Sequence, residues 1–266
     1  MADFDLTSRS REALEPANYF LRYVRESGEL VELSMRGTFL LTQQPALTKA
    51  MLELDEYRAG ELNPDREHVL QDASRLADLA QRELQRDFPL LNAHAIVGVW
   101  GALESWIGDM CCRWVGLFPD RCDWGNRRIK VSPDDLLSDD PGQKAQVLLA
   151  TLKADLKADE KLGVNQFESM LRPLGLSGPV PKLISDALFR MQQIRHIYAH
   201  RAGIADAVFV ERCHSLMDCA VGERVHVDGK QMSVLTSAAV QYSHILHLRV
   251  EDLLFGTAEW PDELKS

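Results

Sequence analysis

The sequence predicts an all-α protein, and three observations carry that prediction. Apolar residues recur at three- and four-residue steps over most of the chain, which is the period of a helix with one buried face. Pro, Gly and Asp gather between these segments, where helices begin and end. Of the 266 residues, 45% are hydrophobic and 26% are charged, as in globular proteins with a sizeable core. We therefore expect helices throughout, with one small β-hairpin near the C-terminus.

The N-terminal part is expected to contain helices over residues 11–27, 40–60 and 65–87. The second of these begins after Pro45, because proline fits the first turn of a helix. Between the first two, the stretch from Glu29 to Met35 alternates polar and apolar side chains and predicts a short strand. Pro89 separates this part from a long helix over residues 93–117.

Further helices are expected over residues 143–161, 165–173, 179–201, 206–219 and 235–254. Residues 119–142 are rich in Pro, Gly, Asp and Arg, which indicates a loop. Asn165 and Glu168 have the spacing of a helix capping box. From Glu223 to Val234, alternating valines precede Asp228-Gly229, a tight-turn signal, and this pattern predicts the β-hairpin.

The helix over 179–201 carries the residues best suited to chemistry. Arg195 falls within its apolar arc, whereas His196 and His200 lie one turn apart on its more polar side. An arginine can hold a phosphate with paired donors, and a histidine can take or give a proton near pH 7. This end of the helix is therefore a candidate site for phosphate chemistry.

Glu104 is the expected partner of Arg195. It projects between Trp100 and Ile107, inside the apolar arc of the helix over 93–117, and acidic residues are rarely buried unless they are paired. The pair has two interpretations. It is either a structural ion pair that joins two core helices, or a support that orients Arg195 at a phosphate site.

The order Arg195, His196, three residues and then His200 resembles the motif of the HEPN superfamily of small all-α domains. The similarity includes the stretch from Ala102 to Trp106 and the connection from Asn165 to Leu176. The resemblance implies a HEPN-like helical bundle over residues 88–256, with an N-terminal helical region over 1–87 that packs on it and a C-terminal tail over 257–266.

The same resemblance implies a cytoplasmic, metal-independent endoribonuclease without a cofactor, in a bacterial toxin or antiphage defence system. The ribose 2′-OH of the RNA substrate would attack the adjacent phosphate, with His200 moving a proton and Arg195 stabilising the oxygen charge. His196, Glu104 and Arg201 would support the phosphate. It further implies a homodimer with a composite site, and an antitoxin or defence-system protein as a possible partner. The alternative is a non-catalytic HEPN module for nucleotide, RNA or protein binding and dimerisation.

The charge of the chain, and the absence of some sequence signals, bear on the expected ligands and location of the protein. The formal net charge of −10 opposes a general nucleic-acid binder, although Arg190, Arg195 and Arg201 cluster around the motif. His196 and His200 have the spacing of two metal ligands, but no third ligand is evident, so we expect no metal site. The polar start predicts no signal peptide, and no apolar run predicts a membrane span. The five cysteines are expected to be reduced core thiols.

Overall fold

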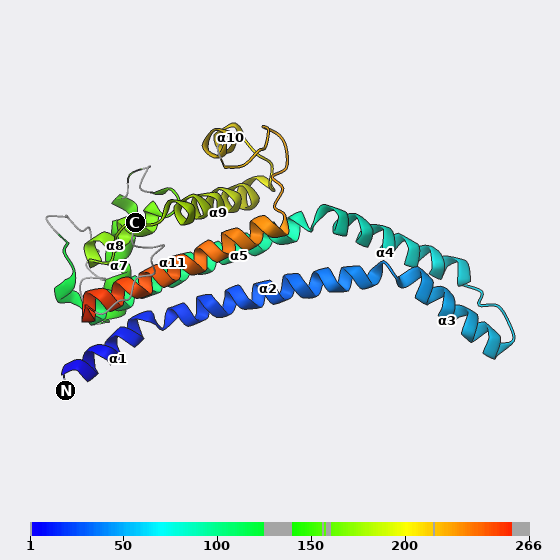
Figure 1. Ribbon diagram of the computed structural model, residues 1–266, viewed down its shortest axis with the longest axis horizontal. Coiled ribbons are helices and arrows are strands. Elements are labelled where there is room, and N and C mark those ends of the chain that lie inside the picture. The colour runs from blue at the N-terminus through cyan, green and yellow to red at the C-terminus, as the bar shows by residue number, and fades with distance from the viewer. Residues whose placement is uncertain (1, 125–139, 156, 158–160, 215, 257–266) are drawn as a thin grey trace. The chain divides into compact units, whose positions relative to one another are not determined.

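The computed structural model describes residues 2–124, 140–155, 157, 161–214 and 216–256, and these confirm the all-α prediction (Figure 1). The helices are α1 (Ala2–Leu14), α2 (Pro16–Leu41), α3 (Gln44–Ala59), α4 (Arg66–Arg86), α5 (Pro89–Leu117), η1 (Pro119–Arg121), α7 (Pro141–Asp155), α8 (Asn165–Leu171), η3 (Arg172–Leu174), α9 (Lys182–Arg201), α10 (Ala207–Cys213) and α11 (Gly229–Phe255). Most of the predicted loop over 119–142 and the predicted tail over 257–266 lie outside the described residues.

The chain forms two compact units, and neither is a contiguous piece of sequence. The first unit takes its residues from 1–25, 96–225 and 233–266, and the second from 26–95 and 226–232. Three long helices, α2, α5 and α11, therefore each contribute residues to both units.

The first unit is built around α5. The apolar side chains along one face of this helix are buried, among them Ile96, Val99, Trp100, Leu103, Trp106, Ile107, Met110 and Trp114. Aromatic rings from other helices pack on them. Phe20 of α2 stacks on Trp106 with ring centroids 5.6 Å apart, and Phe167 of α8 lies 5.4 Å from Trp100. Burial of such rings stabilises a core strongly, so α5 fixes the positions of the helices around it.

In the second unit, α3 packs against α4, and the turn between them is held by Glu56. Its carboxylate accepts hydrogen bonds from the Arg66 guanidinium and from the Asn63 backbone N–H. The hydrogen bond from Arg66 is the main reason why the pKa of Glu56 is lowered. Large apolar side chains of this unit are exposed, including Leu30, Leu33, Phe39, Leu40, Leu47, Met51, Tyr57 and Leu62.

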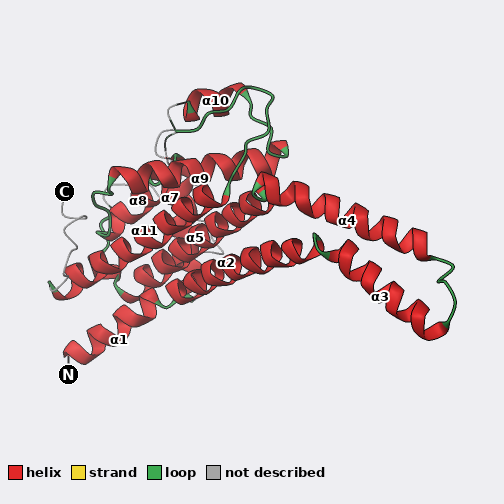
Figure 2. Cartoon of the chain, turned by 45° about the vertical axis from the view of Figure 1, so that its right-hand side comes forward, coloured by secondary structure: helices red, strands yellow, loops and turns green. Residues whose placement is uncertain are grey.

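The predicted β-hairpin over 223–234 is wrong. The described residues form no strand there, and α11 begins at Gly229 (Figure 2). Asp228 Oδ1 accepts the Gln231 N–H at 2.6 Å, and Gln231 Oε1 accepts the Asp228 N–H at 3.2 Å. This reciprocal pair is a capping box. Asp228-Gly229 therefore starts a helix, and the alternating Val225 and Val227 are buried in the preceding loop.

Two other local predictions are also wrong. The expected strand over residues 29–35 lies inside α2, because its Glu, Leu and Met residues are good helix formers and a short alternation fits either period. The expected capping box at Asn165 does not form, since Val164 holds the N-cap position of α8 without a side-chain hydrogen bond. Glu168 turns instead towards a buried cluster described below.

Two further findings concern the chain as a whole. All five cysteines carry free thiols, and those of Cys111 and Cys213 are buried. Burial raises the pKa of the Cys213 thiol to about 11. Over the part of the chain that the structure describes, no helix combines the length and the apolar character needed to cross a membrane.

Candidate functional site

The C-terminal end of α9 carries four of the five predicted site residues. His196 and His200 are exposed, and their ring centroids lie 5.0 Å apart with the ring planes inclined by 56°. Arg195 is half-buried and Arg201 is exposed. The helix stays α-helical to Arg201, so residues 195 and 200 point about 140° apart. One chain therefore brings the two histidines together but does not bring Arg195 and His200 to the same point.

A loop fixes this end of α9. The Tyr198 hydroxyl donates to the carbonyl oxygen of Val225 at 2.6 Å, and the Val225 N–H donates to the Gly203 carbonyl at 2.8 Å. Gly203 stops the helix, as the sequence predicts, with φ of 81° after Ala202 at 51°. A Cβ on Gly203 would lie 2.9 Å from two ring carbons of Tyr198. The close approach of backbone and ring requires a glycine and fixes Tyr198, which lies between His196 and His200 in the sequence.

Arg201 turns towards the next helix. Its Nη2 lies 3.7 Å from Oδ2 of Asp206, the N-cap residue of α10, which also accepts the Phe209 N–H at 2.8 Å. Arg201 remains largely exposed, so this ion pair is worth little energetically. The carboxylate nevertheless offsets part of the positive charge beside His200.

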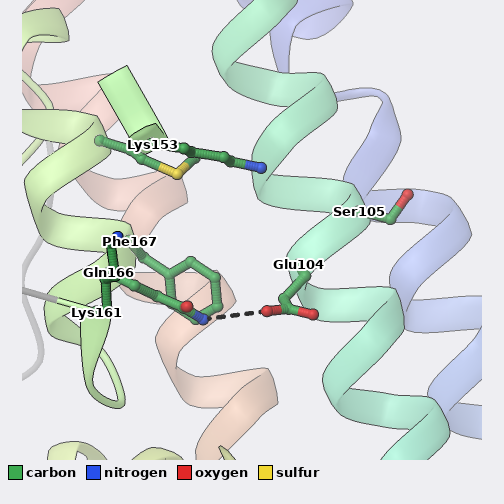
Figure 3. A pocket seen from close by; sticks show the side chains of 7 residues that line it. Glu104, Ser105, Lys153, Lys161, Gln166 and Phe167 are labelled. Atoms are coloured by element: carbon green, nitrogen blue, oxygen red, sulfur yellow. Dashed lines mark hydrogen bonds between the residues drawn. The ribbon is translucent and has the colours of Figure 1, made fainter. Parts of the chain in front are cut away.

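The predicted ion pair between Glu104 and Arg195 does not form. Glu104 is half-buried on α5, and its Oε1 accepts a hydrogen bond from Nε2 of Gln166 at 3.3 Å (Figure 3). Within the described residues, the Arg195 guanidinium makes no hydrogen bond or ion pair with a side chain or carbonyl. The partner of Glu104 is therefore the neutral amide of Gln166, and not the guanidinium of Arg195 that the sequence predicts.

Two glutamines connect Glu104 to α9. The Gln166 side-chain oxygen accepts from Nε2 of Gln192 at 3.4 Å, and the same Nε2 donates to the Lys161 carbonyl at 2.8 Å. The Gln192 side-chain oxygen accepts the Gly163 N–H at 2.7 Å. Gln192 precedes His196 by one helical turn. The candidate residues on α5 and α9 are therefore linked by amides, with no charge pair between them.

The buried ion pair of this unit lies elsewhere, and sequence reasoning missed it. Arg249 of α11 is 7% exposed and donates from Nη1 to Oε1 of Glu168 at 2.8 Å. It also donates to the carbonyls of Leu176 and Pro179. The Tyr242 hydroxyl donates to the same Glu168 oxygen at 2.6 Å. An arginine within an apolar helical run was the available signal, because such a charge must be paired.

Burial raises the pKa of Tyr242 well above its ordinary value, and the neighbouring Glu168 carboxylate raises it further. The phenol therefore stays protonated and acts as a donor in this cluster. Every charged group of the cluster has partners within the core, which is the arrangement expected of a structural element.

Among the described residues, no three His, Cys, Asp or Glu side chains gather in a way that could hold a metal ion. His196 and His200 thus have no third ligand of these types within that part of the chain. In the comparisons with known proteins, the chain matches no family model, no curated protein and no solved structure.

Proposed function

We propose that this protein is a metal-independent endoribonuclease that cleaves RNA by attack of the 2′-OH on the adjacent phosphate. The observation that supports this proposal is the exposed pair of His196 and His200, whose rings lie 5.0 Å apart. The reaction needs one group to accept a proton and another to donate one, and two neighbouring imidazoles near neutral pH suit both roles. The resemblance of the motif to that of the HEPN superfamily also favours this activity.

The reaction needs two proton transfers, and each histidine can carry out one of them. One imidazole takes the proton of the 2′-OH as that oxygen bonds to phosphorus. The other gives a proton to the departing 5′ oxygen as its bond to phosphorus breaks. The products are a cyclic phosphate and a 5′-OH. We assign His200 to one of these transfers and His196 to the other, because their shared position at the end of α9 allows both to reach the oxygens of one phosphate.

The proposed site needs a cation for the phosphate oxygens, and Arg195 of the same chain points elsewhere. A homodimer with a two-fold axis near the ends of two α9 helices would place Arg195 of one protomer beside the histidines of the other. Arg201 would add positive charge beside His200, and Glu104 would keep Gln166 and Gln192 in position. We place this activity in a cytoplasmic toxin or antiphage defence system, with an antitoxin or a defence protein as partner.

The test is RNA cleavage by the purified protein in the presence of EDTA. We expect the unaltered chain to cut RNA, and both His200→Ala and His196→Ala to lose activity by about 10² to 10⁴-fold. His68→Ala is the matched control, since it removes another exposed histidine from α4 and should cut normally. Cleavage that requires added Zn²⁺ or Mg²⁺ would contradict the mechanism and favour His196 and His200 as metal ligands.

The net charge of −10 favours a second candidate, the non-catalytic HEPN module that binds a nucleotide, RNA or protein and dimerises. In that case Arg195 and the histidines contribute to a binding surface. RNA that is bound but left intact, with His200→Ala changing only the affinity, would favour this candidate over the nuclease.

A further inference from the structure

A pocket of about 470 Å³ opens between α5, α7 and α8, wholly within the first unit. Its lining residues are Glu104, Ser105, Lys153, Lys161, Gln166, Phe167 and Met170 (Figure 3). Sites for small organic ligands have volumes of roughly 300–1,000 Å³. The pocket is thus large enough for such a ligand, or for one unit of a longer chain.

The described lining residues of this pocket include more cations than anions, whereas the chain as a whole is acidic. Lys153 and Lys161 contribute two ammonium groups, Glu104 contributes one carboxylate, and the chain as a whole has a formal charge of −10. Within the described residues, neither lysine makes an ion pair. Two ammonium groups that have no ion-pair partner among the described residues suit an anionic ligand.

Lys153 is exposed and reaches across the pocket. Lys153 extends from α7 towards α5, where its Nζ lies 4.0 Å from the position that a Cβ on Gly108 would occupy (Figure 3). Glu104 lies on α5 one turn before Gly108 and points to Gln166, whereas the Ser105 side chain points away from Gln166 (Figure 3). The cationic and anionic groups are therefore separated along the wall of the pocket.

The floor of the pocket is preformed. Phe167 and Met170 are 2% and 3% exposed, and Phe167 is held between Trp100 and Tyr242, with ring centroids 5.4 Å and 6.0 Å away. These contacts hold the ring in the floor of the pocket. A ligand would meet a floor that is already in place, which lowers the entropic cost of binding.

Glu104 gives the pocket a second kind of recognition. Its carboxylate receives one hydrogen from Gln166 and is only half-buried, and a carboxylate has acceptor positions for about four hydrogen bonds. The remaining positions suit hydroxyl donors. The amide of Gln166 is held in turn by Gln192, so the carboxylate keeps its orientation.

We propose that this pocket binds a sugar phosphate, with the phosphate on Lys153 and Lys161 and the sugar hydroxyls on Glu104. Lysine is a common phosphate binder. Two ammonium groups match the two charges of a free phosphate monoester, and one ammonium group is enough for the single charge of a phosphodiester in an RNA strand. The sugar phosphate is either a free metabolite or the ribose-phosphate unit of an RNA strand. The second source rests on the proposed ribonuclease function, and the hydrogen bond from Gln192 to Gln166 links the lining of the pocket to α9 one turn before His196.

The test uses isothermal titration calorimetry with ribose 5-phosphate and with inorganic phosphate, and fluorescence anisotropy with a single-stranded RNA ten-mer. Lys153→Met and Lys161→Met should each weaken ribose 5-phosphate binding about tenfold, the loss expected for one charge-assisted hydrogen bond. Lys144→Met, also exposed and on α7, is the matched control and should bind as the unaltered chain does. Glu104→Gln should weaken binding of ribose 5-phosphate but not of inorganic phosphate.

The RNA measurement is made in the His200→Ala background, which prevents cleavage. Lysine-dependent binding of ribose 5-phosphate without RNA identifies a free metabolite as the source, and lysine-dependent binding of RNA identifies the strand. No binding of either ligand at millimolar concentration, or binding that Lys153→Met and Lys161→Met leave unchanged, would overturn the proposal. Loss of the ribonuclease proposal alone would leave the ribose 5-phosphate result intact, since that measurement needs no cleavage.

Discussion

Arg249 shows how this chain accommodates a charge in its core. Three acceptors surround its guanidinium, namely the Glu168 carboxylate and two backbone carbonyls. The same rule, that a buried charge needs a partner, led from the sequence to Glu104 and Arg195. Helical periodicity shows which face of a helix a residue occupies, but it does not show which residue of another helix it meets. The prediction that Glu104 has a polar partner is therefore correct, but the predicted partner, Arg195, is wrong.

Replacement of Arg249 should destabilise the protein strongly. Arg249→Met leaves the Glu168 carboxylate buried without its cation, which costs about 3–5 kcal/mol. Urea denaturation followed by circular dichroism measures the free energy of unfolding. The double variant Arg249→Met with Glu168→Gln removes both charges and should recover part of the loss. An Arg249→Met protein as stable as the unaltered chain would contradict the role of this pair.

His247 makes the stability depend on pH. Burial lowers its pKa below the ordinary value of 6.5, and His244 lowers it further, while Glu251 acts in the opposite direction. The unfolded chain therefore binds this proton more readily than the folded chain does. The neutral His247 ring favours the folded state fully above pH 6.5, the pKa in the unfolded chain. This stabilisation is lost as the pH falls through the lower pKa that His247 has in the folded chain.

We expect His247→Gln to reduce this loss. Thermal unfolding at pH values between 5 and 8 should show a smaller fall of the melting temperature on the acid side for the variant. His68→Gln, at an exposed site on α4, should leave the profile unchanged. Parallel profiles for His247→Gln and the unaltered chain would show that another group sets the acid sensitivity.

At the scale of the elements, the sequence predicted most helices because their apolar faces repeat over many turns. The errors fall where a short signal has two meanings. Asp228-Gly229 fits both a hairpin turn and a helix cap, and Gln231, three residues after Asp228, decides for the cap. The end of α9 was predicted at Gly203, because a glycine after the last apolar residue commonly stops a helix.

Gly203→Ala should weaken the end of α9 and the proposed site together. The substitution forces an alanine to φ near 81° and places its Cβ against the Tyr198 ring, a strain of about 1–3 kcal/mol. Gly222→Ala is the control, because Gly222 has φ of 89° but open space around the new Cβ. We expect both variants to unfold at lower temperature, and only Gly203→Ala to impair RNA cleavage. Equal cleavage by the two would show that the Tyr198 contact does not position His200.

At the scale of the whole molecule, the proposed nuclease requires two copies. Arg195 and His200 diverge by about 140° on one regular helix, so a shared site must draw them from different chains. Arg195→Ala and His200→Ala, each inactive alone, should regain some cleavage when co-expressed, because a heterodimer restores one complete set. Light scattering establishes the oligomeric state of each preparation. A fully active monomer would refute the shared site.

The division of three long helices between the two units has a consequence for biosynthesis. Domains generally fold in order as they leave the ribosome. Here Asn92 is bonded to Val227 across 135 residues, and Asp87 to Gly229 across 142 residues. The second unit is complete only after residues 226–232 have been translated, and the first only after the rest of α11, so both units are completed late in synthesis. A stop codon before residue 226 would remove residues that both units need, so neither unit would be complete.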